Sequence, residues 1–409
     1  MSAAPLLPVD DAIARIGAAI TPLSAECILV GDTGGRVLAE RLTARRTQPP
    51  FDGSAMDGYA VRVADVSNVP TALAVIGESA AGRSFDQVVG HSEAVRIFTG
   101  APLPAGADTI VIQEDTTRDG DAVLINEVPK PNQHIRRAGI DFREGDTFLH
   151  TGRRMSASDV ALAAAMNIPE LAVFKKPRVA FFATGDELVL PGETPGPNQI
   201  VSSNSPGLSA LIREFGGEPV DLGIARDNEA SIKDCAERAR GADILVTLGG
   251  ASVGDHDLVQ PVLTSMGLSV DFWRIAMRPG KPLMFGDLNG VPFLGLPGNP
   301  VSALVCGQLF LRTAIEARQG MAAAHPPLIP VTLGVDLKEN DKRQDYLRAT
   351  LQVVDGAWIA TPLNQQDSSM LSALSRSHCL LVRPPHAPAA KAGDFCPSVL
   401  LRAPDLSTV

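Results

Sequence analysis

The sequence predicts a multidomain protein of the α/β and β classes, in which a central three-layer α/β domain with a mainly parallel sheet is joined to a β-rich domain that precedes it and to a C-terminal β-domain. Three observations support this prediction. The chain has 409 residues, which is more than one hydrophobic core usually serves. Strand and helix patterns alternate over residues 176–327. Short strand patterns without long helices fill residues 50–141 and the segment from residue 328 onward.

The N-terminal part combines one helix with a run of short strands. Apolar side chains recur at helical spacing over residues 9–20, which predicts an amphipathic helix that packs on one of the domains. From about residue 50 to 141, β-type runs such as YAVRV and DTIVIQED are separated by Gly, Pro, Asn and Asp turns. This region is therefore expected to be a compact all-β domain.

The central region alternates between strands and helices. RVAFFATG ends in a turn, and Ser205 with Pro206 predicts the N-cap and first-turn proline of the next helix. Further helices are expected over residues 228–240, 256–266 and 301–318, each between apolar strands. Apolar strands connected by helices are typical of a parallel sheet covered on both faces, whose ligands gather at the carboxyl ends of the strands. Residues 176–327 are thus the expected active domain.

The last region begins after the proline-rich stretch HPPLIP, residues 325–330, which is typical of a linker. Short strand patterns follow, among them VTLGVDL, YLRATLQVV and CLLVRPP. A small C-terminal β-domain is expected here.

Composition excludes several classes of function. With 36 Lys and Arg against 46 Asp and Glu, the net charge of −10 opposes nonspecific binding to nucleic acid or to an anionic membrane. The start, MSAAPLLPVDDAIARIG, lacks the pattern of a signal peptide, and no 18-residue apolar stretch follows. The five cysteines form no C-x-x-C pair, which argues against a zinc knuckle or a disulfide framework and favours a reducing cytoplasm.

Three glycine-rich turns are expected at the edge of the central sheet where ligands bind. They are TGDEL, LGGASVGDHD and LPGNPVSAL, and each follows a strand. Glycines let backbone amides approach an oxyanion closely, and the helix N-termini that follow add partial positive charge. Each turn alone is equally compatible with an ordinary strand-to-helix connection, but the three together favour a phosphate-like ligand. Neither G-x-G-x-x-G nor a P-loop is present, which disfavours a dinucleotide or Walker-type site.

Basic and acidic side chains accompany these turns. MRPGKPL places Arg278 and Lys281 around a rigid Pro-Gly turn, where both cations could pair with one substrate phosphate, although a solvated loop is the alternative. Carboxylates recur in apolar or glycine-rich settings and could hold Mg²⁺ with substrate phosphate, although any one of them alone fits a turn or cap: Asp57, Asp141, Glu187, Asp227 and Asp257. His256 lacks a second ligand at metal-binding spacing and is interpreted as structural.

Seven segments, in order along nearly the whole chain, resemble the bacterial molybdopterin molybdotransferase family and the enzymatic C-terminal domain of gephyrin. They are PPFDGSAMDGYAVR, RIFTGAPLPAGADTIVIQE, RRAGIDFREGD, FFATGDEL, TLGGASVGDHD, RPGKPLMFG and GLPGNPVSALV. The TLGGASVGDHD segment also resembles molybdopterin adenylyltransferases, so it is the combination that is specific.

The resemblance implies an elongated homodimer with shared active sites. It implies a reaction in which molybdate enters the dithiolene of adenylylated molybdopterin while AMP is released, assisted by Mg²⁺ or a similar cation. It also implies four domains in each chain: an α/β catalytic domain from 1–20 and 176–327 that resembles molybdopterin adenylyltransferase, an inserted β-rich domain over 50–141, a connecting and dimerising domain from 21–49 and 142–175, and the C-terminal β-domain over 328–409.

The resemblance also suggests roles for individual residues. Asp227 and Asp257 match metal or pyrophosphate-site positions. Reactive or charged positions of the site are matched by Asp57, Thr99, Asp141, Glu187, Asp257, Arg274, Arg278 and Lys281, with the first three supplied by the partner subunit. Substrate-binding positions are matched by Gly249, Gly250, Ser252, Gly254, Pro297, Gly298, Asn299, Pro300, Ser302, Arg348 and Ser369. The adjacent Ser368 is an alternative to Ser369, and Arg278 stands where some members have lysine.

Two other functions are compatible with parts of the sequence. An adenylyltransferase that acts one step earlier would need the α/β domain alone, so the two β-domains count against it. A scaffold that binds the cofactor precursor without turnover would not need the carboxylates and the basic loop. Transient contact with an adenylyltransferase and with apo-molybdoenzymes is also expected from the resemblance.

Overall fold

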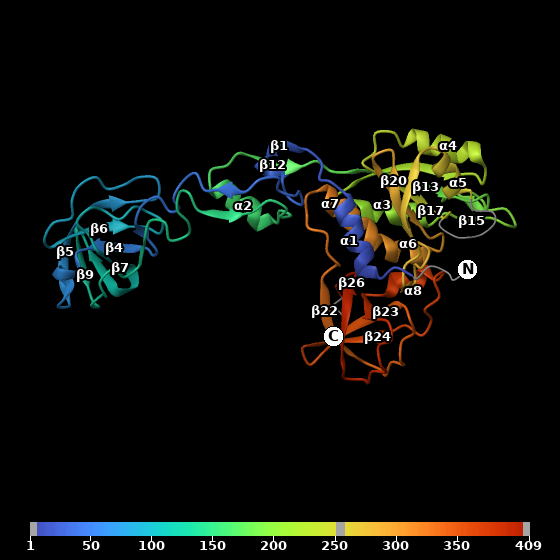
Figure 1. The fold of residues 1–409 in the computed structure, drawn as a ribbon. Coiled ribbons are helices and arrows are strands. Elements are labelled where there is room, and N and C mark those ends of the chain that lie inside the picture. The colour runs from blue at the N-terminus through green and yellow to red at the C-terminus, as the bar shows by residue number, and fades with distance from the viewer. Residues whose placement is uncertain (1–5, 251–257, 404–409) are drawn as a thin grey trace.

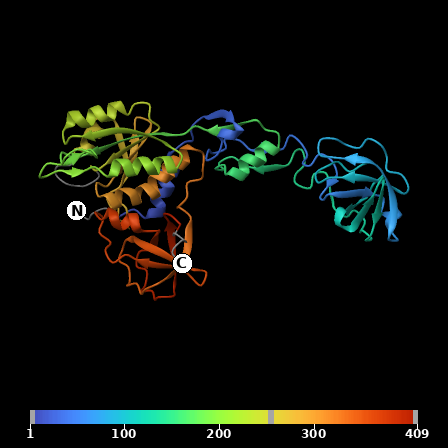
Figure 2. The same ribbon diagram turned by 180° about the vertical axis from the view of Figure 1, so that it is seen from behind.

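The structure is a computed structural model that describes residues 6–250 and 258–403. The molecule is elongated (Figures 1 and 2), with a β-rich domain at one end, a small connecting domain in the middle, and the α/β domain with the C-terminal domain at the other end. The predicted fold class is confirmed. The sheets, and the helices that cover them, explain how residues distant in sequence reach one site.

The α/β domain is built on a six-stranded sheet. The strand order is β16 (Glu218–Ala225), β13 (Arg178–Thr184), β17 (Ile244–Leu248), β21 (Val291–Leu296), β20 (Met284–Leu288) and β18 (Leu268–Trp273). The first four strands are parallel, and β20 runs antiparallel to both of its neighbours, β21 and β18. A two-stranded parallel pair, β14 (Leu188–Val189) and β15 (Ile200–Val201), lies outside this sheet. Because parallel strands share one direction, the turns after β13, β17 and β21 meet at one edge.

Alternation of side chains along the strands creates two apolar faces and hence three layers. Val179 and Phe181 of β13 join the core under one set of helices, α1 (Val9–Ala19), α3 (Asn204–Glu214), α6 (Pro300–Cys306) and α7 (Arg312–Arg318). The intervening Ala180 and Phe182 join the core under α4 (Glu229–Arg238) and α5 (Val259–Ser265). Each fully buried Phe stabilises the fold by about 1.5–3 kcal/mol relative to an exposed one.

Three local expectations differ from the structure. Helix α3 begins at Asn204 with Ser203 as its N-cap, so Ser205 and Pro206 lie inside the first turn rather than at its boundary. The helix expected over 301–318 contains a π-helical segment, η4 (Gly307–Leu311), between α6 and α7. Strand β20 was not expected, because its pattern directly follows the basic loop.

The connecting domain is formed by two separate stretches of chain. Strand β1 (Ala25–Leu29) pairs with β12 (Glu170–Phe174), and β2 (Leu42–Thr43) pairs with β11 (Thr147–Leu149). The 3₁₀ turn η1 (Val30–Asp32) and helix α2 (Ala157–Ala165) complete it. Ser156 and Asp159 form a capping box at the start of α2, which satisfies amides that the helix itself leaves unpaired.

The distal β-rich domain is inserted between β2 and β11. Its six-stranded sheet has the order β7 (Thr109–Ile112), β4 (Gly58–Val61), β6 (Glu93–Ile97), β5 (Thr71–Ser79), β9 (Ala122–Ile125) and β8 (Thr116–Asp119). A short pair, β3 (Gly53–Ser54) with β10 (Ile135–Arg136), and the 3₁₀ turns η2 (Val63–Val66) and η3 (Gln113–Asp115) complete the domain.

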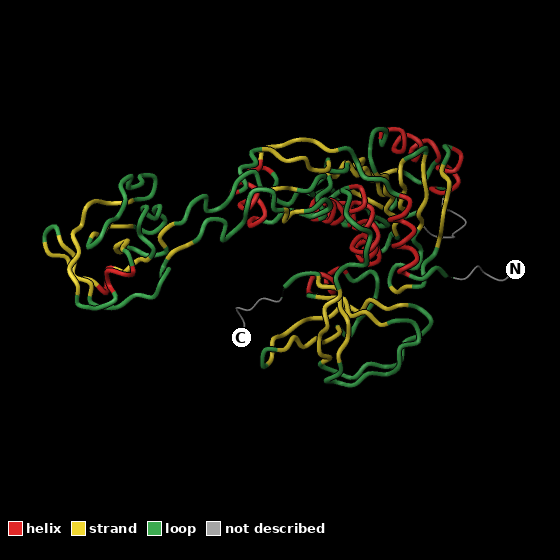
Figure 3. The backbone as a smooth tube through the Cα atoms, turned by 60° about the vertical axis from the view of Figure 1, so that its left-hand side comes forward, coloured by secondary structure: helices red, strands yellow, loops and turns green. Residues whose placement is uncertain are grey.

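The C-terminal domain is a barrel-like sheet that closes through pairing of β23 with β25. Its strands are β22 (Leu328–Leu333), β23 (Gln344–Val354), β24 (Ala357–Pro362), β25 (Cys379–Arg383) and β26 (Phe395–Leu400), with helix α8 (Leu371–Arg376). Tyr346 and Leu380 of this sheet belong to the same apolar core as helix α1, and the two domains lie side by side in Figures 1 and 3. A shared core holds the two domains in one arrangement.

None of the helices in the described part of the chain has both the length and the hydrophobicity that a membrane span requires. All five cysteines are free thiols, four of them buried.

Candidate functional site

A cleft of about 860 Å³ lies where the turns of the α/β sheet face the C-terminal domain. The ends of β13 and β17 contribute Thr184 and Leu248, and the segment between β14 and α3 contributes Ser202. The basic loop 277–282, the turn 297–300 and residues 366–369 of the C-terminal domain complete its walls. The cleft is therefore at the carboxyl ends of the parallel strands, where ligands bind in such sheets.

The basic loop reaches the cleft because a short strand crosses between the domains. Strand β19 (Met277–Arg278) pairs in parallel with β23, with Arg278 opposite Asp345. Gly280 has φ of +105°, and a Cβ there would lie 2.5 Å from the sulfur of buried Cys306. Both the backbone conformation and the close approach require glycine. The loop is thus held by strand β23 of the C-terminal domain and by the close contact of Gly280 with Cys306 of helix α6.

The two cations of this loop differ in their surroundings. Arg278 Nε donates to Asp345 Oδ1 at 2.9 Å, Arg278 Nη2 binds the other carboxylate oxygen, and Asp341 lies 3.6 Å from Nη1. These hydrogen bonds to Asp345 raise the pKa of Arg278. Lys281 lines the cleft, is exposed, and has no carboxylate partner in the described part of the chain. Lys281 is therefore the cation more available to an anionic ligand.

The turn after β21 joins two other walls of the cleft. Asn204 Nδ2 donates to Gly298 O at 2.7 Å, and Asn299 Nδ2 donates to Ser368 Oγ at 2.9 Å. The backbone amide of Val301 donates to Ser368 O at 3.0 Å. The cleft is lined by every residue predicted for this turn: Pro297, Gly298, Asn299, Pro300 and Ser302. Their binding of a substrate stays a prediction.

The glycine-rich segment after β17 begins beside this turn. Gly249 and Gly250 have φ of +97° and +69°, which favours glycine, and a Cβ on Gly298 would lie 3.7 Å from the Cα of Gly249. Ser252, Gly254 and Asp257, predicted for the same segment, lie outside the described residues.

The carboxylates predicted for the α/β domain occupy neighbouring turns. Glu187 lines the cleft after β13. Asp227 follows β16 and accepts a hydrogen bond at 3.3 Å from the amide of Asp186, whose own carboxylate accepts one at 3.3 Å from the amide of Asp227. Within the described ranges, no three His, Cys, Asp or Glu side chains come together as a metal site.

The residues predicted in the C-terminal domain surround the cleft at different depths. Ser368 and Ser369 both line it, but Ser368 contacts the turn of Asn299, whereas Ser369 Oγ donates to Asp367 at 2.6 Å. Arg348 is 1% exposed and lies behind this wall, where it donates to Asp367 O at 3.1 Å while its Nε has no partner among the described residues. Burial lowers the pKa of Arg348.

Arg274 does not line the cleft. Its guanidinium lies 4.8 Å from the ring centre of Trp273, and its backbone oxygen accepts a hydrogen bond from Leu7. A single chain therefore gives no geometric support for the predicted role of Arg274.

Three predicted residues come from the distal half of the molecule. Asp57 precedes β4 and Thr99 follows β6, and Figure 1 places these strands at the opposite end from β13 and β17. Asp57 Oδ1 accepts hydrogen bonds from Thr99 N at 2.7 Å and Thr99 Oγ1 at 2.8 Å, and these bonds lower the pKa of Asp57. Asp141 is exposed in the chain that leads back to the connecting domain. One chain alone does not bring these residues to the cleft.

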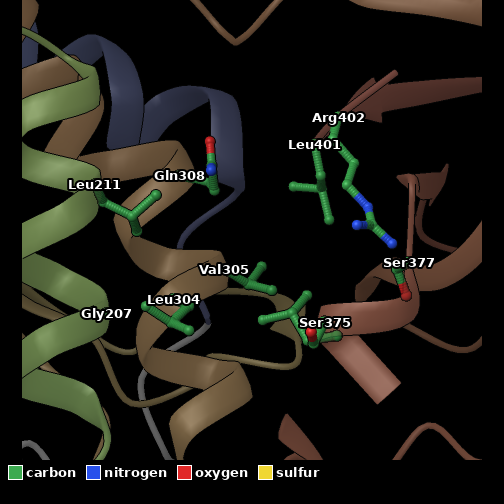
Figure 4. A pocket seen from close by; sticks show the side chains of 10 residues that line it. Gly207, Leu211, Leu304, Val305, Gln308, Ser375, Ser377, Leu401 and Arg402 are labelled. Atoms are coloured by element: carbon green, nitrogen blue, oxygen red, sulfur yellow. The ribbon is translucent and has the colours of Figure 1, made fainter. Parts of the chain in front are cut away.

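A second pocket of about 240 Å³ lies between α3, α6, η4 and α8. Figure 4 shows that Leu211, Leu304 and Leu401 surround it, with Arg402 at one side. None of its described lining residues is a carboxylate, and its walls are mainly apolar, so the larger polar cleft suits an oxyanion better.

Sequence reasoning missed several residues of the cleft. Ser202, Asn204 and Arg343 line it. In the run VSSNSPG, which leads into helix α3, only Ser205 and Pro206 were interpreted, as a helix cap, although the N-terminus of a helix is also a place where anions bind. Arg343 gave no such signal.

Comparison with known protein families divides the chain into three matches. Residues 7–167 match the MoeA N-terminal region (domain I and II), residues 180–317 match a probable molybdopterin binding domain, and residues 330–401 match the MoeA C-terminal region (domain IV). These matches cover both β-rich regions as well as the α/β domain.

Curated relatives and solved structures agree with these matches. A molybdopterin molybdenumtransferase of Nostoc sp. is 38% identical over 79% of this chain and 76% of its own length. One of Haemophilus influenzae is 37% identical over 88% of this chain and 90% of its own length. The crystal structure of a molybdopterin biosynthesis MoeA protein from Pyrococcus horikoshii OT3 superposes with a TM-score of 0.84 at 28% identity, covering 97% of this chain and all of that one. The resemblance seen in the sequence is confirmed, and the chain belongs to the MoeA family.

Proposed function

We propose that this chain is a molybdopterin molybdenumtransferase, which inserts molybdate into adenylylated molybdopterin and releases AMP with the help of Mg²⁺ in the last steps of molybdenum cofactor synthesis. Membership of the MoeA family supports the transferase activity. The observation that carries the proposal is the cleft itself, because its lining combines Lys281 and Arg278 with glycine turns and serine hydroxyls. Molybdate and pyrophosphate are both oxyanions that such donors bind.

The residues of the cleft have separable tasks in this proposal. Lys281 attracts the oxyanion, and Arg278, held by Asp345, presents its outward N–H groups in a fixed direction. Ser302 and the turn 297–300 bind the substrate from the side of the α/β domain. A cleft built on a shared core keeps these groups in place, so little reorganisation is needed when the substrate binds.

The described residues are compatible with a Mg²⁺ ion. Asp186 and Asp227 place two carboxylates in adjacent turns, and Mg²⁺ is usually bound by one or two carboxylates together with substrate phosphates. Oxygen ligands of this kind suit Mg²⁺ better than a soft metal. When bound, the ion would withdraw negative charge from the phosphate oxygens.

We further propose a homodimer in which Asp57, Thr99 and Asp141 of one subunit complete the cleft of the other. The distance between these residues and the cleft within one chain supports this arrangement. Activity in the cytoplasm fits five free thiols. Transient contacts with an adenylyltransferase and with apo-molybdoenzymes would supply the substrate and receive the product.

A scaffold that binds the precursor without turnover is the rival function. The purified protein is supplied with adenylylated molybdopterin, molybdate and Mg²⁺, and both AMP release and reconstitution of an apo-molybdoenzyme are measured. The proposal predicts release of AMP together with an active molybdoenzyme. Binding of the precursor without either product would support the scaffold instead.

A further inference from the structure

Polar atoms without partners lie at the edge of the cleft where helix α3 begins. Ser202 is 3% exposed and lines the cleft, yet its hydroxyl has no hydrogen-bond partner among the described residues. The side-chain oxygen of Asn204 is also unpartnered in that part of the chain. Buried polar atoms of folded proteins nearly always have a hydrogen-bond partner. Two such atoms without a partner, at the same edge of a cleft, therefore point to a ligand that binds there.

The same place offers backbone donors and positive potential. Helix α3 has 11 residues, and within residues 6–250 and 258–403 no side chain caps its N-terminus. The first amides of a helix have no intrahelical partner, and the helix dipole adds partial positive charge there. Ser203 and Asn204 line the cleft at this end of the helix.

Asn204 connects this helix end to the rest of the cleft. Its amide nitrogen donates to Gly298 O at 2.7 Å, so the start of α3 is held against the turn 297–300. The unpartnered Asn204 oxygen is an acceptor. A ligand here should therefore carry an anionic group for Ser202 and the helix amides and a hydroxyl or N–H donor for Asn204.

We propose that the N-terminus of α3, with Ser202 and Asn204, is a phosphate subsite separate from the oxyanion site at Lys281. This inference rests on the proposed function, in which the substrate carries both a phosphate and an adjacent hydroxylated group, while molybdate enters at the basic loop. One wall of the cleft then holds the phosphate of the adenylate, and the other holds the incoming molybdate.

Binding to the full-length protein tests the subsite without requiring turnover. Dissociation constants of AMP, inorganic phosphate, adenosine and molybdate are measured by calorimetry for the wild type, Ser202→Ala and Lys281→Ala. Ser202→Ala should weaken AMP and phosphate about tenfold, because a hydrogen bond to a charged group is lost, and should leave molybdate within about twofold. Lys281→Ala should weaken molybdate more than phosphate.

Thr247→Val is the matched control. Thr247 is also fully buried with an unpartnered hydroxyl among the described residues, but it does not line the cleft. It should bind AMP like the wild type. Equal loss of AMP in Thr247→Val and Ser202→Ala, or unchanged AMP and phosphate binding in Ser202→Ala, would overturn the subsite.

A second variant keeps the test decisive if Ser202→Ala does not fold. Asn204→Asp adds a negative charge that a helix N-terminus tolerates but that repels phosphate, so AMP binding should be lost by more than tenfold. Unchanged AMP affinity in Asn204→Asp would contradict the proposal. Adenosine binding as tight as AMP binding would also contradict it, because the phosphate would then contribute nothing. If the wild type shows no turnover but the Ser202 and Asn204 variants lose AMP affinity as predicted, the proposed function would be overturned and the phosphate subsite would stand.

Discussion

Asp345 holds the guanidinium of Arg278 through both carboxylate oxygens, across two strands that are separated by 67 residues in sequence. The Asp345 side chain is 6% exposed, whereas 48% of the Arg278 side chain is exposed. The pair fixes the direction of Arg278 and offsets its charge. Lys281, three residues later, keeps its charge available.

This difference predicts that replacing Lys281 affects substrate binding, whereas replacing Arg278 affects stability. Lys281→Ala should raise the KM for molybdate about tenfold or more with an unchanged melting temperature, because an exposed, unpaired charge is lost. Molybdate saturation of AMP release measures the effect. Saturation curves equal to those of the wild type would remove Lys281 from the oxyanion site.

Arg278→Ala should instead destabilise the protein. Its removal leaves the buried Asp345 carboxylate unpaired, and half-exposure of the arginine limits the expected loss to about 1–3 kcal/mol. Thermal unfolding checks this, and Arg278→Ala combined with Asp345→Ala should recover part of the loss. No recovery in the double variant would show that the ion pair is not the cause.

Gly280 predicts a steric effect on the same loop. Gly280→Ala should lower stability by about 1–3 kcal/mol and weaken molybdate binding, because the added Cβ meets Cys306 and the φ of +105° disfavours alanine. Gly290→Ala is a matched control, since Gly290 has φ of +88° with nothing within 4 Å of a Cβ. Equal effects of both substitutions on molybdate binding would exclude the contact with Cys306 as the reason.

Much of the fold could be predicted because its signals are local. The apolar run RVAFFATG that forms β13 is visible in the sequence, and so are the glycines of the turns after β17 and β21. Glu187, Lys281 and Ser302, which the sequence analysis proposed for one site, all line the same cleft, while their roles there stay a prediction. Strands that run parallel bring their ends together whatever the length of the helices between them.

The rest depends on contacts that no local pattern encodes. Strand β19 has two residues and pairs with a strand of another domain, so the partner of Arg278 could not be identified from the sequence. The sequence interpretation paired both cations with the substrate, whereas the structure gives Arg278 a carboxylate of its own. Ser202 and Asn204 were missed because small polar residues before a helix are equally typical of a cap.

The connecting domain predicts a pH-dependent effect at helix α2. Arg153 donates to both oxygens of Asp159, and Ser156 N donates to Asp159 Oδ2 at 2.9 Å; these bonds lower the pKa of Asp159. A lowered folded-state pKa stabilises the fold above the ordinary Asp pKa of about 4, and this stabilisation is lost as the pH falls below it. Asp159→Asn should therefore weaken α2 by about 1 kcal/mol at pH 7 and by less at pH 3. Hydrogen exchange of α2 amides in variant and wild type at each pH measures the difference, and a constant difference would contradict the assignment.

The position of Asp57 predicts complementation between subunits. If Asp57 of one subunit completes the cleft of the other, a heterodimer of Asp57→Ala and Lys281→Ala chains contains one site with both substitutions and one with neither. Such a heterodimer should have about half of the wild-type activity, because one of two symmetric sites is intact. If each site were built within one chain, both sites would carry one substitution and the heterodimer would be as inactive as the parents. Two different affinity tags isolate the heterodimer, and AMP release by that species decides between the two arrangements.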